Sequence, residues 1–179
     1  MWRAWDRVIE GWALGQLGAQ EAALKQIADN LAELRTSGQQ WSLPYYLALY
    51  AETLVLCNQF DVAMDSISEG LQLAGATKEC WWEAELNRLH GELMLLCQRP
   101  QEQAAEEAFA KSLRIARTQG ARSLELRAAA SLAALWAKQG ERRRAHDLLA
   151  PVYGWFAEGF ETADLKQTRR QVEQLAASS

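Results

Sequence analysis

Residues that commonly carry catalysis are few in this 179-residue chain and are not arranged in pairs. Its two histidines, His90 and His146, match neither the HExxH pattern nor another spacing of metal ligands. A histidine without an orienting partner is a poor general base, so we expect His90 to be a partly buried packing residue, with a ligand or base role as the alternative. No GxSxG nucleophile segment and no GxxxxGK(S/T) phosphate loop is present. The sequence therefore predicts no catalytic residue, no metal ligand, no cofactor and no enzyme activity.

Cysteines and one basic run are the other residues that could do chemistry. The three cysteines lack CxxC spacing, and their odd number is typical of a reducing cytoplasm. Cys57 and Cys97 are equivalent to Leu17 in the first of the repeats described below. We therefore expect the two cysteines to act as small hydrophobic residues, with a redox pair as the alternative. Consecutive residues of a helix point in different directions, so Arg142–Arg144 predicts a solvated surface, with a contact to a phosphate or an acidic partner as the alternative.

Composition indicates which elements would position any site. Hydrophobic residues make up 49% of the chain and charged residues 23%, which suits a buried core. Alanine and leucine are frequent, whereas valine and isoleucine, which favour strands, are rare. The longest apolar stretch, 128–137, is too short to span a bilayer, and Asp6 and Glu10 stand where a signal peptide would be apolar. With a net charge of −4, we expect a cytoplasmic all-α protein that binds neither membranes nor nucleic acids.

A four-fold internal repeat organises the sequence. Each repeat has a small residue, a turn residue seven positions later, and an alanine in the helix that follows. The small residues are Gly11, Ala51, Gly91 and Ala133, the turn residues are Gly18, Asn58, Gln98 and Gly140, and the alanines are Ala23, Ala63, Ala105 and Ala145. Four positions after each alanine stands a large apolar residue: Ile27, Ile67, Phe109 or Leu149. These regular spacings of 40 or 42 residues indicate stacked helix pairs.

Each repeat reads as two helices joined by a short turn. We predict one domain over 1–179, with repeats at about 3–37, 43–75, 79–119 and 121–157 and a capping helix at 163–176. The expected paired helices are 3–17, 20–37, 43–57, 60–75, 79–97, 101–119, 121–139 and 141–157. The last helix has Leu165, Thr168, Val172 and Leu175 on one side, as a solenoid cap requires. No cap precedes Trp2 and Trp5, which indicates either a truncated domain boundary or a homodimer through the first repeat.

The pattern resembles the tetratricopeptide repeat (TPR), in which a small residue, an aromatic residue or leucine, a glycine turn and an alanine follow at these offsets. The period here is 40 rather than 34 residues, which implies longer helices or longer turns between pairs. Gly11 and Gly91 match the glycine of the family, and Ala51 and Ala133 replace it with the next smallest side chain. The resemblance implies a right-handed α-α superhelix of four helix pairs with a concave face.

A narrower resemblance is carried by the segments 83–93, 112–129 and 148–166. They are similar to the C-terminal repeat tail of bacterial signalling proteins that join a nucleotide cyclase domain and a STAND-like ATPase to helical repeats. The likeness covers residues 40–179 well and the first repeat loosely. It implies a regulatory or partner-binding tail that carries neither the cyclase nor the ATPase chemistry of the intact relatives.

The TPR register also implies a binding groove on the first helix of each pair. Its candidate residues are Trp5, Trp12, Tyr45, Glu52, Glu85, Arg88, Glu92, Arg127 and Lys138. Glu85, Arg88 and Glu92 share one helical face, and because surface ion pairs add little stability, we interpret them as recognition residues. We therefore predict a non-catalytic module for signal transduction that binds a protein or peptide in this groove, with a small-molecule effector sensor as the alternative.

Overall fold

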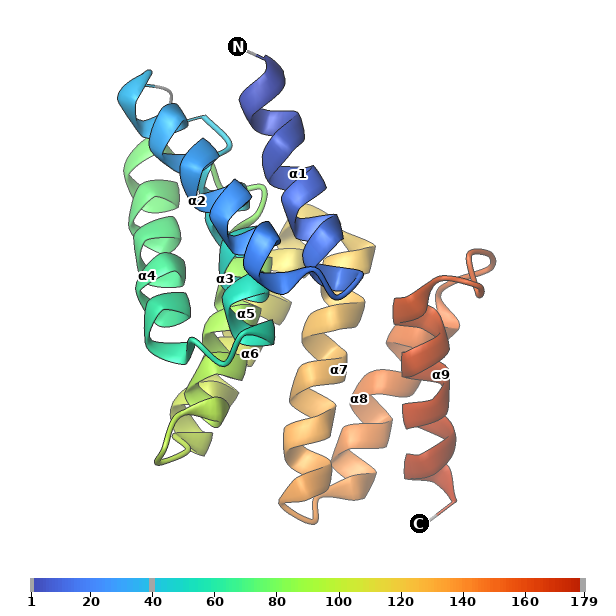
Figure 1. The fold of residues 1–179 in the computed structure, drawn as a ribbon. Coiled ribbons are helices and arrows are strands. Elements are labelled where there is room, and N and C mark those ends of the chain that lie inside the picture. Colours follow the sequence, from blue (N-terminus) through green and yellow to red (C-terminus); the bar gives the residue numbers. More distant parts are fainter. Residues whose placement is uncertain (1, 39–40, 178–179) are drawn as a thin grey trace.

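The computed structural model describes residues 2–38 and 41–177, with the backbone alone for residues 2–5. These residues form nine α-helices and no strand (Figure 1). The helices are α1 (Trp2–Gln16), α2 (Gln20–Thr36), α3 (Leu43–Leu56), α4 (Phe60–Thr77), α5 (Glu83–Leu96), α6 (Glu102–Gln119), α7 (Arg122–Lys138), α8 (Arg142–Gly154) and α9 (Ala163–Ala176). None of them, within the described residues, is both long and apolar enough to cross a membrane. The all-α prediction from the alanine and leucine content is confirmed.

Consecutive helices pack as pairs, and the pairs stack on one another (Figure 1). α1 packs against α2, α3 against α4, α5 against α6, and α7 against α8. The first helices of successive pairs also contact each other, so α1, α3, α5 and α7 form one side of the stack, and α9 packs on α7 and α8. Stacking buries apolar faces that an isolated pair would leave in water. The fold is therefore an all-α, TPR-like solenoid.

Small residues lie where the two helices of a pair meet. The alanines of the second helices, Ala23, Ala63, Ala105 and Ala145, are all fully buried. On the first helices, Ala51 and Ala133 are fully buried as well. Gly11 lies so close to α2 that a Cβ atom there would come within 2.8 Å of the Ile27 side chain. Because packed interiors leave no room for extra atoms, the spacing of these small residues sets the pairing of the helices.

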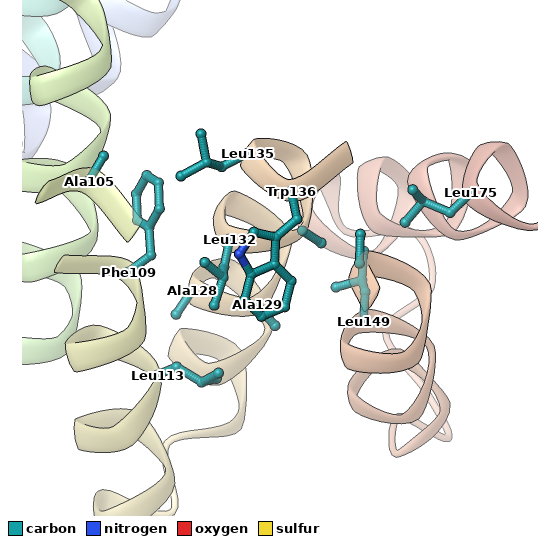
Figure 2. Packing of buried hydrophobic residues seen from close by; sticks show 12 residues of the cluster. Ala105, Phe109, Leu113, Ala128, Ala129, Leu132, Leu135, Trp136, Leu149 and Leu175 are labelled. Atoms are coloured by element: carbon teal, nitrogen blue, oxygen red, sulfur yellow. The ribbon is translucent and has the colours of Figure 1, made fainter. Parts of the chain in front are cut away.

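One large apolar residue per repeat fills the core beside each alanine. Ile27, Ile67, Phe109 and Leu149 are at most 1% exposed. In the C-terminal part of the core, Phe109 of α6 and Trp136 of α7 belong to one cluster (Figure 2). Leu175 of α9 joins the same cluster. The final helix is therefore joined to the last repeat through core contacts.

The turns within pairs follow the predicted pattern at three positions. Gly18, Asn58 and Gly140 have positive φ angles of 96°, 58° and 88°, the left-handed conformation that ends a helix. Gln98 also lies in the connection between two helices, as predicted, but it is not among the positive-φ residues of the described chain. The chain leaves α5 in an extended conformation at Cys97, with φ −68° and ψ 161°. The two additional residues of this repeat lie in the resulting longer loop.

The sequence predicts that the fifth helix begins near residue 79. In the structure it begins at Glu83. Lys78 ends α4 in the left-handed conformation, with φ 57°. The carboxylate of Glu79 then accepts a hydrogen bond from the backbone N–H of Ser42 at 2.8 Å and another from Trp81 Nε1 at 2.8 Å. Glu79 thus connects two loops instead of starting a helix.

Cys57 and Cys97 lie at the C-terminal ends of α3 and α5 and not in the core. Leu17, the equivalent residue of the first repeat, is 84% exposed because the chain has already left α1 there. Both cysteines are half-buried with free thiols. The Sγ atom of Cys97 donates to the carbonyl oxygen of Met94 at 3.0 Å.

Candidate functional site

A cavity of about 1000 Å³ lies between the first helices of the pairs and α9. Residues of α3, α5 and α7 line it, Trp12 and Gln16 of α1 border it, and α9 forms a further wall. On each helix the lining residues recur about one turn apart, so each helix turns one face toward the cavity. In Figure 1, α7, α8 and α9 lie together at the C-terminal end of the stack, and α9 contacts α7 as well as α8.

α9 contributes side chains both to the lining of the cavity and to the hydrophobic core. Leu165 is buried, Asp164 and Gln171 line the cavity, and Leu175 is buried but also borders the cavity. Gln171 donates from Nε2 to the carbonyl oxygen of Ala130 on α7 at 3.0 Å. α9 is therefore apolar where it packs on α7 and α8, and most of the residues that it contributes to the cavity are polar.

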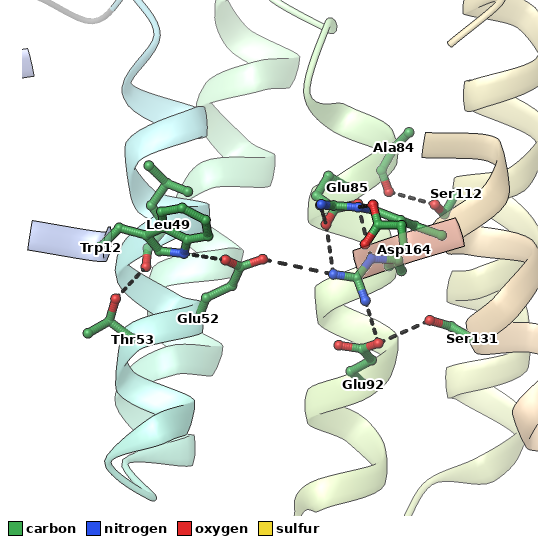
Figure 3. A network of polar contacts seen from close by, with 12 residues as sticks. Trp12, Leu49, Glu52, Thr53, Ala84, Glu85, Glu92, Ser112, Ser131 and Asp164 are labelled. Carbon is green, nitrogen blue, oxygen red and sulfur yellow. Dashed lines mark hydrogen bonds and ion pairs between the residues drawn. The ribbon is translucent and has the colours of Figure 1, made fainter. Parts of the chain in front are cut away.

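Glu85 of α5 is the centre of a charge network beneath the cavity (Figure 3). It is only 1% exposed, and its carboxylate accepts hydrogen bonds from Arg88 Nη2 at 2.7 Å and Arg88 Nε at 3.0 Å. Arg127 Nη1 of α7 donates to the same carboxylate at 3.0 Å. A buried charge is tolerated only when it is paired and hydrogen-bonded. Glu85 thus holds together two arginines from adjacent repeats.

The two arginines extend the network to three more carboxylates. Arg88 Nη1 donates to Glu92, one turn further along α5, and Arg88 Nη2 lies 4.0 Å from Glu52 Oε1 on α3. Arg127 Nε donates to Asp164 Oδ2 of α9 at 2.7 Å. Four carboxylates therefore surround two guanidinium groups, and the network connects four helices.

Two uncharged donors orient the outer carboxylates of the network. Trp12 Nε1 on α1 donates to Glu52 Oε2 at 2.6 Å, and Ser131 Oγ on α7 donates to Glu92 Oε1 at 3.0 Å (Figure 3). Each bond joins the first helices of two neighbouring pairs. The concave side of the stack is thus held together by polar contacts as well as by the core.

Burial changes the ionisation of these groups. It raises the pKa of Glu52, and the negative charge of Glu85 raises it further, against the opposing effect of the bond from Trp12. Burial alone would lower the pKa of Arg88, but the Glu85 and Glu92 carboxylates outweigh it and hold that pKa above its usual value. Arg88 therefore stays charged, whereas Glu52 accepts a proton more readily than an exposed glutamate does.

Five of the predicted groove residues line the cavity: Trp12, Glu52, Arg88, Glu92 and Arg127. Glu85 lies buried beneath that lining, where it pairs with both arginines. Its burial means that it stabilises the arginines and does not present its charge to solvent. Trp5 has its side chain outside the described part of the structure.

Tyr45 and Lys138 lie away from the lining. The Tyr45 ring packs in an aromatic cluster, with centroids 4.9 Å from Trp82 and 5.4 Å from Trp81. Lys138 is exposed, and its Nζ lies 3.8 Å from Glu102 Oε1 of α6, the second helix of the preceding pair. The register places both on first helices, but neighbouring residues draw their side chains to other partners.

Asp164, Ser131 and Gln171 complete the cavity but are not among the residues predicted from the sequence. The repeat register places groove residues on the first helix of each pair only, and α9 is not one of these helices. One signal is present in the sequence, because the predicted stripe includes the polar residue Thr168. A stripe that packed only on core residues would have no need of a polar side chain.

The cavity offers guanidinium donors, carboxylate acceptors and aliphatic surface. Among the described residues, no group of three or more His, Cys, Asp and Glu side chains is placed to hold a metal ion. His90 is half-buried and is not part of the lining, and burial together with the charge of Lys111 lowers its pKa. These groups suit the recognition of a polar, partly apolar molecule.

Comparison with known sequences gives one distant relative, and no model of a protein family matches. The chain is 29% identical over 129 residues to an uncharacterized protein of Rhizobium meliloti (strain 1021). The match covers 70% of this chain but only 12% of the relative, so the chain corresponds to a small part of a much longer protein.

Comparison with solved structures gives the class of fold. Two crystal structures of a kinesin light chain-like protein of Podosopora anserina, with nearly identical TPR-like repeats, superpose with a TM-score of 0.73. They share 15% sequence identity with this chain, and the superpositions cover 98% of it and 85% or 86% of those chains. The chain is thus a TPR-like helical repeat in architecture.

Proposed function

We propose that this chain is a non-catalytic interaction module that binds a short segment of a protein partner in the cavity. The observation that carries the proposal is the cavity itself, about 1000 Å³ in volume and lined by the first helices of successive pairs and by α9. Charged and aliphatic side chains lie together there, as they do in protein interfaces, where an apolar centre is surrounded by polar groups. The charges would set the register of the segment, and the aliphatic residues would bury its apolar side chains.

A small-molecule effector is the second candidate, and the size of the cavity favours it. A volume of about 1000 Å³ lies at the upper end of the range for small-molecule sites. Arg127 and Asp164 join α7 to α9 across the cavity, so an effector that displaced this bond would move α9. A small-molecule effector would act by changing the position of α9. A peptide could bind to the exposed surface of the cavity without moving this helix.

We also propose that residues 1–179 form one such unit of a bacterial signalling protein, acting in the cytoplasm as the regulatory tail of an attached or partner ATPase. The support is the distant relative, of which the match occupies only 12%. A short match of this kind is what a helical repeat joined to other domains would give. The similarity of segments 83–93 and 112–129 to such tails adds to it.

Self-association through the first repeat is a further proposal. Ile9 of α1 is 42% exposed, and Leu17 just after α1 is 84% exposed. Exposed apolar side chains can form a contact between copies of the chain. Light scattering at increasing protein concentration tests it, and a constant monomer mass would contradict it.

Two tryptophan substitutions test the binding of a segment in the cavity. Ala134 of α7 is exposed within the lining, and Ala76 is exposed near the end of α4, away from the cavity. Ala134→Trp would occupy part of the cavity, whereas Ala76→Trp adds the same side chain to the outer surface. Short random peptides displayed on phage are selected on the native chain, and their affinities for all three proteins are measured by fluorescence anisotropy.

Peptides bound in the cavity should lose at least about ten-fold in affinity for the Ala134→Trp protein, which corresponds to about 1.4 kcal/mol. The same peptides should bind the Ala76→Trp protein as tightly as the native chain. A selection that yields no peptide, or only peptides that bind all three proteins equally, would contradict the proposal.

A further inference from the structure

Two neighbouring repeats present the same pair of side chains to the cavity. Glu52 and Leu56 lie one turn apart on α3, and Glu92 and Leu96 lie one turn apart on α5. The two pairs are forty residues apart, which is the period of the repeat. Since α3 and α5 contact each other, the two glutamates form an acidic row and the two leucines form an aliphatic row beside it.

The aliphatic row is accessible. Leu56 is 36% exposed and Leu96 is 45% exposed, although the other leucines of these two helices are buried or half-buried. Val55 of α3 and Ala137 of α7 continue the apolar lining on either side. Exposed aliphatic side chains gathered in a concave surface mark a site of interaction with an apolar group.

The acidic row carries an excess of negative charge. The four carboxylates of the network exceed its two guanidinium groups, and each guanidinium already donates to two carboxylates. Three carboxylate oxygens accept no hydrogen bond from the described residues: Glu52 Oε1, Glu92 Oε2 and Asp164 Oδ1. In Figure 3, Glu52 of α3 and Glu92 of α5 extend toward one guanidinium group, that of Arg88, and Asp164 of α9 lies beside Glu85. The row is therefore able to accept hydrogen bonds from a cation.

The lining contains two further arginines, Arg142 and Arg170, outside the network. Arg170 is six residues beyond Asp164, about 9 Å along the axis of α9. Arg142 donates from Nη2 to the carbonyl oxygen of Gln174, ten residues beyond Asp164 and about 15 Å along the same axis. Arg170 forms no ion pair with a network carboxylate among the described residues, so the excess of carboxylates over guanidinium groups is a property of the network and not of the whole lining.

Building on the proposed function, we propose that the bound segment carries a lysine or arginine close to one or more large aliphatic side chains. The aliphatic side chains cover Leu56 and Leu96, and the basic side chain reaches the carboxylates of Glu52, Glu92 and Asp164. An acidic group beside the acidic row is disfavoured, because Arg88 and Arg127 already pair with these carboxylates and the network has four carboxylates for two guanidinium groups.

The composition of selected peptides tests this chemistry. The relevant peptides are those from the random phage library that bind the Ala134→Trp protein more weakly than the native chain. They should be enriched in lysine or arginine together with leucine, isoleucine or phenylalanine. Their affinity should fall as salt is added, because the attraction is electrostatic.

One charge-removing variant and one matched control connect the preference to the acidic row. Glu92→Gln keeps an acceptor for Ser131 and removes one of the excess charges at a side chain that is 40% exposed. Glu107→Gln makes the same change at an exposed position of α6, outside the lining. Basic peptides should bind Glu92→Gln at least about five-fold more weakly and Glu107→Gln unchanged, with both variants melting near the native temperature.

The outcomes separate this inference from the proposed function. Peptides that need the cavity but are acidic or uncharged, or basic peptides that bind Glu92→Gln as tightly as the native chain, would overturn the inference and leave peptide binding intact. The absence of any peptide that depends on Ala134 would overturn both. If a cavity-dependent peptide is bound through its basic residue, replacing that residue by glutamine should produce the same loss as Glu92→Gln, and the two changes should not add.

Discussion

The ring of Phe109 on α6 packs directly against the backbone of Gly91 on α5. A Cβ atom built on Gly91 would lie 2.6 Å from Phe109 Cε1 and 2.8 Å from Cδ1, which is far inside van der Waals contact. Phe109 is 1% exposed and belongs to a cluster that includes Ala105 and Leu132, so its ring has no space to retreat. The close approach of the two helices in this pair depends on the missing side chain.

Gly91→Ala should therefore destabilise the protein by about 1–3 kcal/mol, the usual cost of overpacking a core. Gly75→Ala is the matched control, since that glycine lies in α4 with nothing within 4 Å of a built Cβ. It should be neutral or stabilise by up to about 1 kcal/mol, because alanine restricts the unfolded chain. Urea unfolding of the two variants and the native chain provides the comparison, and equal stabilities would refute the contact.

Arg88→Met should lower the free energy of unfolding by on the order of 3 kcal/mol, because it leaves the Glu85 carboxylate with one partner in a buried site. Arg35→Met removes an ion pair with Glu69 whose side chains are 46% and 40% exposed, and should cost less than about 1 kcal/mol. Thermal melting followed by circular dichroism distinguishes the two. Losses of equal size would show that the network does not hold the helices together, and a large loss makes Arg88 unsuitable as a probe of binding.

Leu175→Ala tests whether α9 is part of the core. Leu175 is 2% exposed and packs in the cluster that contains Leu149, so its truncation should cost about 2–5 kcal/mol. Leu17→Ala removes the same atoms at a side chain that is 84% exposed and should change stability by less than about 0.5 kcal/mol. Amide hydrogen exchange should show faster exchange throughout α9 in the first variant. Unchanged protection in α9 would mean that the helix is held by other contacts.

Glu52 should make stability depend on pH. Its folded pKa is raised, mainly by burial, so the folded state holds the proton more tightly than the unfolded chain does. The contribution of Glu52 to stability is therefore fully present below its unfolded pKa and is lost as pH rises through the folded value. Glu52→Gln, which is neutral throughout, should consequently be more stable than the native chain at pH 7 and lose this advantage in acid.

Urea unfolding at a series of pH values measures this difference. Glu107→Gln is the control, since its side chain is exposed on α6 and its removal should leave the pH dependence as it is. A Glu52→Gln protein that is less stable than the native chain at pH 7 would show that the bond from Trp12 and the attraction of Arg88 outweigh burial.

Much of the fold follows from the sequence because helix pairing depends on local periodicity. The positions of Gly11, Ala23, Ala63 and Ala105 are enough to set which helices meet, since only small side chains allow the close approach. The conformation of the loop after α5 does not follow from the sequence in this way. Glutamine at position 98 gives no steric indication of how the longer connection would run.

The tertiary structure decides which residues line the cavity. Tyr45, Glu85 and Arg127 occupy equivalent positions in three repeats, yet the first joins an aromatic cluster, the second is buried and the third lines the cavity. Asp164 enters the site only because α9 packs beside α7. A repeat pattern fixes the helix face on which a residue lies. Whether that face meets solvent, a neighbour or an opposing charge depends on contacts between segments far apart in the chain, and these are set by the packing of the whole stack.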